Sequence, residues 1–215
     1  MIKAVQPKEE KRHSAVLLLG PTGSGKTPLG QLLERQGLWG LRCLHFDFGH
    51  ELRSSVSENQ VLTGPDREVV AQMLRTGALL EDEHFPIARK LLDDFMLRNR
   101  ANIETLIVFN GLPRHIGQAA SMERIVRMQA VISLECTPET ILYRIANNSG
   151  GDRTDRVDDS LAEVTRKLEL FKERTALLVD YYRSRHVGVI SVEVGPVSTA
   201  AEMLAKIEKP WGLSN

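Results

Sequence analysis

The chain has 215 residues, 42% of them hydrophobic, and its 28 Lys and Arg residues balance its 28 Asp and Glu residues. This length and composition are enough for one sizeable hydrophobic core, so we expect a single domain over residues 14–215. The balanced charge excludes the strongly basic surface that sequence-independent DNA binding requires, and we expect no nucleic-acid partner.

The N-terminal residues 1–13 predict a disordered tail, because they are rich in charge and hold no apolar core of a signal peptide. No apolar run approaches the roughly 18 residues that a membrane-spanning helix needs. We therefore expect a cytoplasmic protein without a membrane partner. Cys43 and Cys136 form no Cys-x-x-Cys pair and are expected to be reduced thiols in or near the core.

Short apolar runs alternate with helical patterns along the chain. The runs have the length of buried strands and cover 15–19, 41–46, 105–109, 130–134 and 187–194. The helical patterns cover 26–36, 67–75, 84–99, 138–147, 160–184 and 198–208, and Thr137 is a suitable N-cap for the fourth. This alternation predicts an α/β sandwich, with a five-stranded parallel sheet and helices on both faces.

The polar stretch 147–155, Asn-Asn-Ser-Gly-Gly-Asp-Arg-Thr-Asp, lies between two of the predicted helices. It is too short to form a domain, and Gly-rich loops of this kind often cover a binding site. We therefore predict a short lid over about 146–157.

Residues 20–27 read Gly-Pro-Thr-Gly-Ser-Gly-Lys-Thr, the full G-x-x-x-x-G-K-[ST] phosphate-binding pattern. The pattern follows the strand-like run 15–19 and opens the helical stretch 26–36, as its mechanism requires. Its glycines let backbone N–H groups point at phosphate oxygens, and the helix N-terminus adds partial positive charge. Lys26 is expected to reach the β- and γ-phosphates, and the Thr27 hydroxyl to bind Mg²⁺. The predicted ATP-binding residues in the loop are Gly20, Thr22, Gly23, Ser24, Gly25, Lys26 and Thr27.

This loop predicts a P-loop NTPase fold, a three-layer sandwich that binds a nucleoside triphosphate, but it does not identify the phosphate acceptor. Four further segments carry a resemblance. They are Phe-Asp-Phe-Gly-His-Glu-Leu-Arg at 46–53, Gly-Ala-Leu-Leu-Glu-Asp-Glu at 77–83, Asn-Gly-Leu-Pro-Arg-His-Ile-Gly-Gln-Ala at 110–119, and Arg144 to Lys167. In order, and over roughly residues 15 to 200, the chain resembles the adenylate kinases and their nucleoside monophosphate kinase relatives.

The resemblance implies an acceptor-binding helical segment at about 47–83. It implies that Arg53 and Arg114 bind the acceptor phosphate, for which the planar fork of arginine is suited, and that Gln118 hydrogen-bonds the acceptor base. The remaining acceptor-binding residues that it implies are Phe48, Gly49, Leu79 and Gly111. Phe48 stands where the family often has a small residue.

For the donor side, the resemblance implies that Arg144 contacts ATP and that Arg144, Arg156 and Lys167 join Lys26 and Arg114 as catalytic cations. Arg153, inside the lid, is expected to be a further catalytic cation in place of the second lid arginine of the family. Asp158 and Asp159 are expected to hold the lid arginines in place. The family has Arg at the positions of Asn148 and Lys167. Asn110 replaces an Asp expected to hold Mg²⁺ through water.

These residues predict a monomeric nucleoside monophosphate kinase that uses Mg²⁺ to move the γ-phosphoryl group of ATP, with AMP as the acceptor because of Gln118. Phosphoryl transfer needs alignment, charge neutralisation and exclusion of water, which cations and a closing lid supply. Three alternatives stay open: a P-loop kinase for another small phosphate or alcohol, a nucleotide-binding regulator with weak catalysis, and a P-loop enzyme that modifies nucleic acid. The last lacks a basic or aromatic stacking surface.

Overall fold

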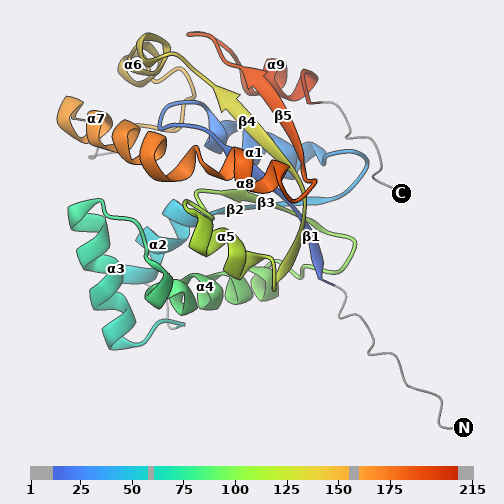
Figure 1. Ribbon diagram of the computed structural model, residues 1–215, viewed down its shortest axis with the longest axis vertical. Coiled ribbons are helices and arrows are strands. Elements are labelled where there is room, and N and C mark those ends of the chain that lie inside the picture. Colours follow the sequence, from blue (N-terminus) through green and yellow to red (C-terminus); the bar gives the residue numbers. More distant parts are fainter. Residues whose placement is uncertain (1–11, 58–60, 155–159, 208–215) are drawn as a thin grey trace, which may run out of the picture.

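The computed structural model describes residues 12–57, 61–154 and 160–207. Its sheet is entirely parallel, with the strand order β2-β3-β1-β4-β5 (Figure 1). The strands are β1 (His13–Leu19), β2 (Cys43–Asp47), β3 (Leu106–Asn110), β4 (Val126–Glu135) and β5 (Gly188–Glu193). The parallel five-stranded sheet predicted from the apolar runs is confirmed.

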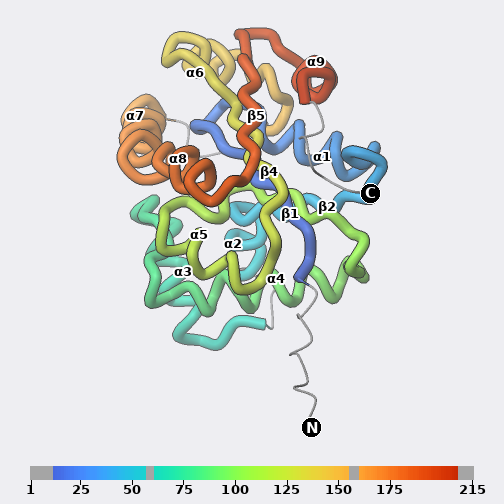
Figure 2. Tube along the Cα trace, turned by 45° about the vertical axis from the view of Figure 1, so that its right-hand side comes forward, coloured from blue at the N-terminus to red at the C-terminus, as the bar shows by residue number. Residues whose placement is uncertain are grey.

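Helices cover both faces of this sheet, as predicted (Figure 2). Alternate residues of β1 separate the two cores: Val16 and Leu18 pack with α1 and α9, whereas Leu17 packs with α4, α5 and α8. The helices are α1 (Lys26–Gln36), α2 (Phe48–Ser57), α3 (Gly64–Thr76), α4 (Phe85–Arg98), α5 (Ile116–Met122), α6 (Pro138–Ala146), α7 (Leu161–Leu170), α8 (Leu178–Arg183) and α9 (Ala200–Ala205). A short 3₁₀ helix (Asp82–His84) precedes α4.

Several boundaries differ from the sequence prediction. The stretch 160–184 is not one regular helix, because a π-helical turn (Phe171–Thr175) lies between α7 and α8. The helical patterns did not locate α2 and α5, although α2 lies within the acceptor-binding helical segment that the resemblance implied. The tail prediction was wrong for His13, which pairs with Val126 at the start of β1, while residues 1–11 lie outside the described chain. The predicted N-cap of α6 is confirmed, since the Thr137 side chain accepts a hydrogen bond from the backbone of Thr140.

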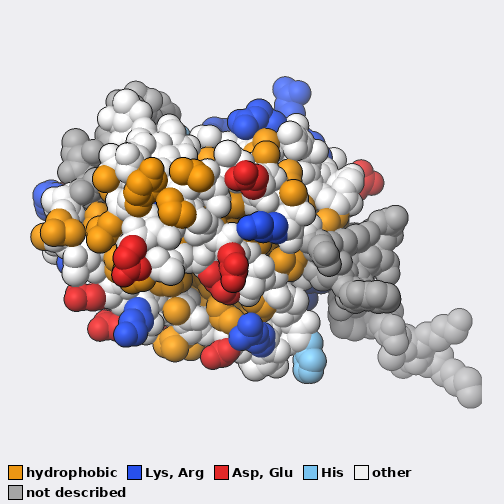
Figure 3. Space-filling model, turned by 90° about the horizontal axis from the view of Figure 1, so that it is seen from above, with side chains coloured by type: hydrophobic (Ala, Val, Ile, Leu, Met, Phe, Trp, Pro, Cys, Tyr) orange, Lys and Arg blue, Asp and Glu red, His pale blue; other side chains and the backbone are white. Residues whose placement is uncertain are grey.

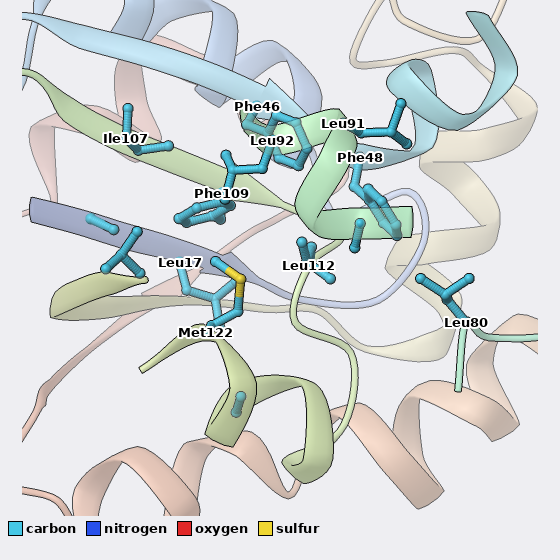
Figure 4. Packing of buried hydrophobic residues seen from close by; sticks show 14 of the residues in the cluster. Leu17, Phe46, Phe48, Leu80, Leu91, Leu92, Ile107, Phe109, Leu112 and Met122 are labelled. Carbon is cyan, nitrogen blue, oxygen red and sulfur yellow. The ribbon is translucent and has the colours of Figure 1, made fainter. Parts of the chain in front are cut away.

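An aromatic cluster anchors the end of β2 in the core. The ring of Phe46 lies edge-on to Phe95 and Phe109, with centroid distances of 5.1 and 5.7 Å, and Phe48 stacks on Phe46 at 6.1 Å (Figure 4). Aromatic pairs of this geometry add to the stability gained by burying their surface. The cluster therefore fixes the point where the chain leaves β2 and enters α2.

Charge is distributed evenly over the surface seen in Figure 3, where acidic and basic side chains alternate among apolar ones. Within the described ranges, no helix is long and apolar enough to cross a membrane.

Candidate active site

A cleft lies at the carboxyl edge of the sheet, where β1, β2 and β3 end. Open parallel sheets bind their ligands at this edge. The cleft brings together these residues predicted from the sequence: Gly20, Thr22, Gly23, Gly25, Lys26, Thr27, Phe48, Gly49, Arg53, Leu79, Asn110, Gly111, Arg114, Gln118, Arg153 and Lys167. The phosphate loop and the predicted acceptor residues therefore share one cleft, as direct transfer between two bound molecules requires.

The phosphate loop needs glycine at two positions for steric reasons. Gly23 and Gly25 have φ angles of 79° and 96°, which side-chain-bearing residues rarely adopt. A Cβ atom on Gly25 would also lie 2.9 Å from the Met203 methyl group, and one on Gly23 would lie 2.9 Å from Ile145. The loop thus turns tightly into α1, whose N-terminus attracts anions.

Lys26 and Ser24, both predicted to bind ATP, differ in burial and in hydrogen bonding. The half-buried Lys26 side chain folds over the loop, and its ammonium donates to the carbonyl oxygens of Gly20 and Pro21 at 2.7 Å each. Ser24, predicted to bind ATP, is fully buried instead, and its hydroxyl has no hydrogen-bond partner among the described residues. Ser24 does not line the cleft, and its backbone amide donates to the Pro21 carbonyl at 3.3 Å, so its predicted contact with ATP stays a prediction.

Thr27 lies in a polar cluster with two strand ends. Its hydroxyl donates to Asp47 Oδ2 at 2.9 Å, and the Asn110 amide donates to the same carboxylate oxygen at 2.9 Å and to Thr27 Oγ1 at 3.1 Å. Burial raises the pKa of Asp47, but hydrogen bonds from the His50 amide and Thr27, with the charges of His45 and Arg53, bring it below its usual value. Sequence reasoning assigned no role to Asp47; the only signal in the sequence was an acidic residue directly after the strand-like run 41–46.

On the acceptor side, the side-chain amide of Gln118 forms hydrogen bonds with backbone groups of the protein. Its side chain is 1% exposed; Oε1 accepts from the Arg114 amide and Nε2 donates to the Leu80 carbonyl, both at 2.7 Å. The predicted contact between Gln118 and an acceptor base stays a prediction. The guanidinium of Arg114, by contrast, belongs to an exposed residue beside Gly111.

Apolar side chains from the acceptor segment line the same half of the cleft. Phe48 is 3% exposed and shares its ring contacts with the core, and Leu79 is 9% exposed. Arg53 is exposed and lies near Gly49, where a Cβ atom would be 3.3 Å from its guanidinium. An apolar wall with arginines near it is suited to a base and its phosphate.

The described part of the predicted lid folds against the phosphate loop. Arg153 is 8% exposed, its amide donates to Asn148 Oδ1 at 3.1 Å, and its guanidinium reaches Thr22 Oγ1 at 3.5 Å. Asn148, where the family has an arginine, thus shapes the lid turn that places Arg153. The predicted site residues Arg156, Asp158 and Asp159 lie outside the described residues.

Arg144 differs most from its predicted role. Its guanidinium is 2% exposed, does not line the cleft, and donates to the carbonyl oxygens of Gly23, Gly195 and Ser198 at 3.0, 2.9 and 2.9 Å. It therefore ties the phosphate loop to the segment between β5 and α9. The predicted contacts of Arg144 with ATP and with the reacting phosphoryl group stay predictions.

This geometry predicts that Arg144→Met lowers the free energy of unfolding by about 2–4 kcal/mol, because it removes hydrogen bonds that join three segments and leaves the half-buried carbonyl groups of Gly23 and Ser198 without this donor. Urea unfolding measures the change. Arg89→Ala is the control, since it removes only an exposed ion pair with Asp93 and is expected to cost under about 1 kcal/mol. Wild-type stability in Arg144→Met would contradict the structural role.

Comparisons with known proteins agree with the resemblance. The family model described as adenylate kinase matches residues 18–187, which is most of the chain. The chain is 30% identical to an adenylate kinase of Prochlorococcus marinus over 177 residues, covering 80% of this chain and 84% of that protein. It is 29% identical to an adenylate kinase of Thermus thermophilus (93% and 97% covered) and 24% identical to UMP-CMP kinase 3 of Oryza sativa (94% and 89% covered).

Proposed function

This chain belongs to the adenylate kinase family and is a nucleoside monophosphate kinase, and we propose that it transfers the γ-phosphoryl group of ATP to AMP with the help of Mg²⁺. The observation that carries the proposal is the single cleft. It is lined by most residues of the phosphate loop, among them Lys26 and Thr27, and also by two arginines and an apolar wall from the predicted acceptor side. A donor and an acceptor bound there would meet between Lys26 and Arg114.

The residues of the cleft can meet the three requirements of phosphoryl transfer, which are alignment, charge neutralisation and exclusion of water. The loop amides and Lys26 bind the donor phosphates, and Arg53 and Arg114 bind the acceptor phosphate. Arg153 and Lys167 add positive charge from the lid and from α7, which neutralises the transferring group. Closure of the lid would exclude water and so prevent hydrolysis of the donor.

The chain also fits a magnesium ion. The Thr27 hydroxyl lies beside a carboxylate at the phosphate loop, and Mg²⁺ prefers oxygen ligands of these kinds together with phosphates. When bound, the ion neutralises charge on the donor phosphates. We propose that Thr27 contributes its hydroxyl to this site.

AMP is proposed as the acceptor because a glutamine at position 118 stands beside the apolar wall and because several relatives carry the name adenylate kinase. Two observations favour a second candidate acceptor, a pyrimidine monophosphate. Both ends of the Gln118 amide are bound to backbone groups, and one relative is named UMP-CMP kinase.

The test is chromatographic detection of product from MgATP with AMP, GMP, CMP, UMP or dTMP in turn. We expect ADP from AMP, at a turnover of about 1–100 s⁻¹. Lys26→Ala protein, purified in parallel, measures contaminating host kinase. Preferential use of UMP or CMP would move the acceptor to a pyrimidine. If no monophosphate reacts, the two surviving interpretations are a different small acceptor and a nucleotide-binding regulator.

A further inference from the structure

The family position expected to carry a magnesium-binding carboxylate holds Asn110, whose amide group has no charge to offer a cation. A carboxylate is nevertheless present beside Asn110, because Asp47 ends the neighbouring strand β2. We propose that Asp47, together with the Thr27 hydroxyl, supplies the metal-binding oxygen atoms for the Mg²⁺ that accompanies ATP. This inference rests on the proposed binding of ATP at the phosphate loop.

The sheet brings the three side chains together. Strands β2 and β3 are parallel neighbours, and their register pairs Asp47 with Asn110 as the last residue of each strand. Both side chains form a hydrogen bond with the hydroxyl of Thr27, the second residue of α1. The carboxylate of Asp47 therefore reaches the same hydroxyl that an acidic residue at position 110 would reach.

The Asn110 amide is oriented as a donor rather than as a metal ligand. Its nitrogen donates to Asp47 Oδ2 at 2.9 Å and to Thr27 Oγ1 at 3.1 Å, and His45 Nε2 lies 3.4 Å away. With its nitrogen turned toward the carboxylate, Asn110 positions Asp47.

The two oxygens of Asp47 have separate tasks. Oδ1 accepts from the His50 amide at 3.0 Å and so caps the first turn of α2, while Oδ2 faces Thr27 and Asn110. A cap needs a single acceptor oxygen, which Asn supplies as well as Asp. The cap therefore does not require the charge of Asp47. Oδ2 lies beside the Thr27 hydroxyl at the phosphate loop, where one carboxylate, one hydroxyl and phosphate oxygens would form a suitable set of ligands for Mg²⁺.

The chain offers a swap that tests this assignment. Asp47→Asn keeps the cap but removes the charge, and Asn110→Asp in the same protein returns a carboxylate to the neighbouring strand end. Two quantities are measured for each variant: ATP affinity by calorimetry in EDTA, and Mn²⁺ affinity of the protein–ATP complex by electron paramagnetic resonance. Neither readout requires phosphoryl transfer.

In Asp47→Asn we expect ATP affinity in EDTA to stay within about threefold of wild type, and Mn²⁺ affinity to fall at least about tenfold. The double variant should recover most of that loss. Asp152→Asn, which removes a lid carboxylate from the same cleft, should change Mn²⁺ affinity by less than about threefold. An equal loss in Asp152→Asn would mean that general cleft charge is responsible, and would overturn the assignment to Asp47.

Failure of the metal site and failure of the proposed function give different results. Unchanged Mn²⁺ affinity in Asp47→Asn, with normal ATP binding, overturns the metal assignment alone. Wild-type protein that does not bind ATP in EDTA or with Mn²⁺ overturns the proposed function and the site with it. If Asp47→Asn does not fold, Asp47→Ser decides, because serine also caps a helix but carries no charge: Mn²⁺ affinity should fall at least about tenfold, and an unchanged affinity overturns the proposal.

Discussion

Replacing Lys26 with alanine is expected to lower the rate of phosphoryl transfer by about 10³-fold without unfolding the protein. The Lys26 ammonium donates hydrogen bonds to the carbonyl oxygens of Gly20 and Pro21 in the phosphate loop. When ATP binds, we expect the ammonium to leave these carbonyls and contact the donor phosphates. The backbone amides of the loop remain in the variant, so ATP should still bind, more weakly. The transition state loses its compensating charge, so kcat should fall more than ATP affinity.

The measurement is kcat with saturating MgATP and AMP, together with a thermal unfolding curve. Lys172→Ala is the matched control, because it removes an exposed lysine of the π-helical turn that does not line the cleft. It should retain wild-type kcat. A wild-type rate in Lys26→Ala would contradict every kinase interpretation of this chain, including those with another small acceptor.

Local patterns in the sequence were sufficient for the sheet and for the phosphate loop. The apolar runs located all five described strands. The signal has a plain cause in β1, β2 and β3, where most residues are buried, because a strand buried on both faces has a continuous apolar sequence. The loop was located because its chemistry fixes residue types at fixed spacing. Periodicity did not locate α2 and α5, because they are short and mix polar residues with apolar ones, so that tertiary packing determines them. Only the resemblance implied a helical segment that includes α2.

The roles of single polar residues were harder to predict, because they depend on contacts between distant segments. A motif position suggested that Arg144 faces ATP, yet the carbonyls that it contacts at Gly195 and Ser198 lie some fifty residues further along the chain. Asp47 was missed for the same reason. Its importance follows from the register of β2 against β3, which sequence periodicity does not supply.

Replacing Arg114 with alanine is expected to lower kcat/KM for the monophosphate acceptor by about 10³-fold, while KM for ATP stays within about threefold. The backbone of Arg114 is held on both sides: Gln118 Oε1 accepts from its amide at 2.7 Å, and the Thr175 hydroxyl donates to its carbonyl at 2.8 Å. Its position is thus fixed while its guanidinium belongs to the cleft. Alanine removes the guanidinium and leaves this frame intact.

Arg114→Lys separates charge from geometry at the same position. Lysine keeps the positive charge but loses the planar fork that bonds two phosphate oxygens at once, so we expect an intermediate loss of about 10- to 100-fold. Steady-state kinetics with AMP varied at fixed MgATP, and then the reverse, measures both constants. Arg124→Ala, an exposed arginine outside the cleft, should behave as wild type. Equal losses for donor and acceptor in Arg114→Ala would place this arginine on the transferring group instead of on the acceptor phosphate.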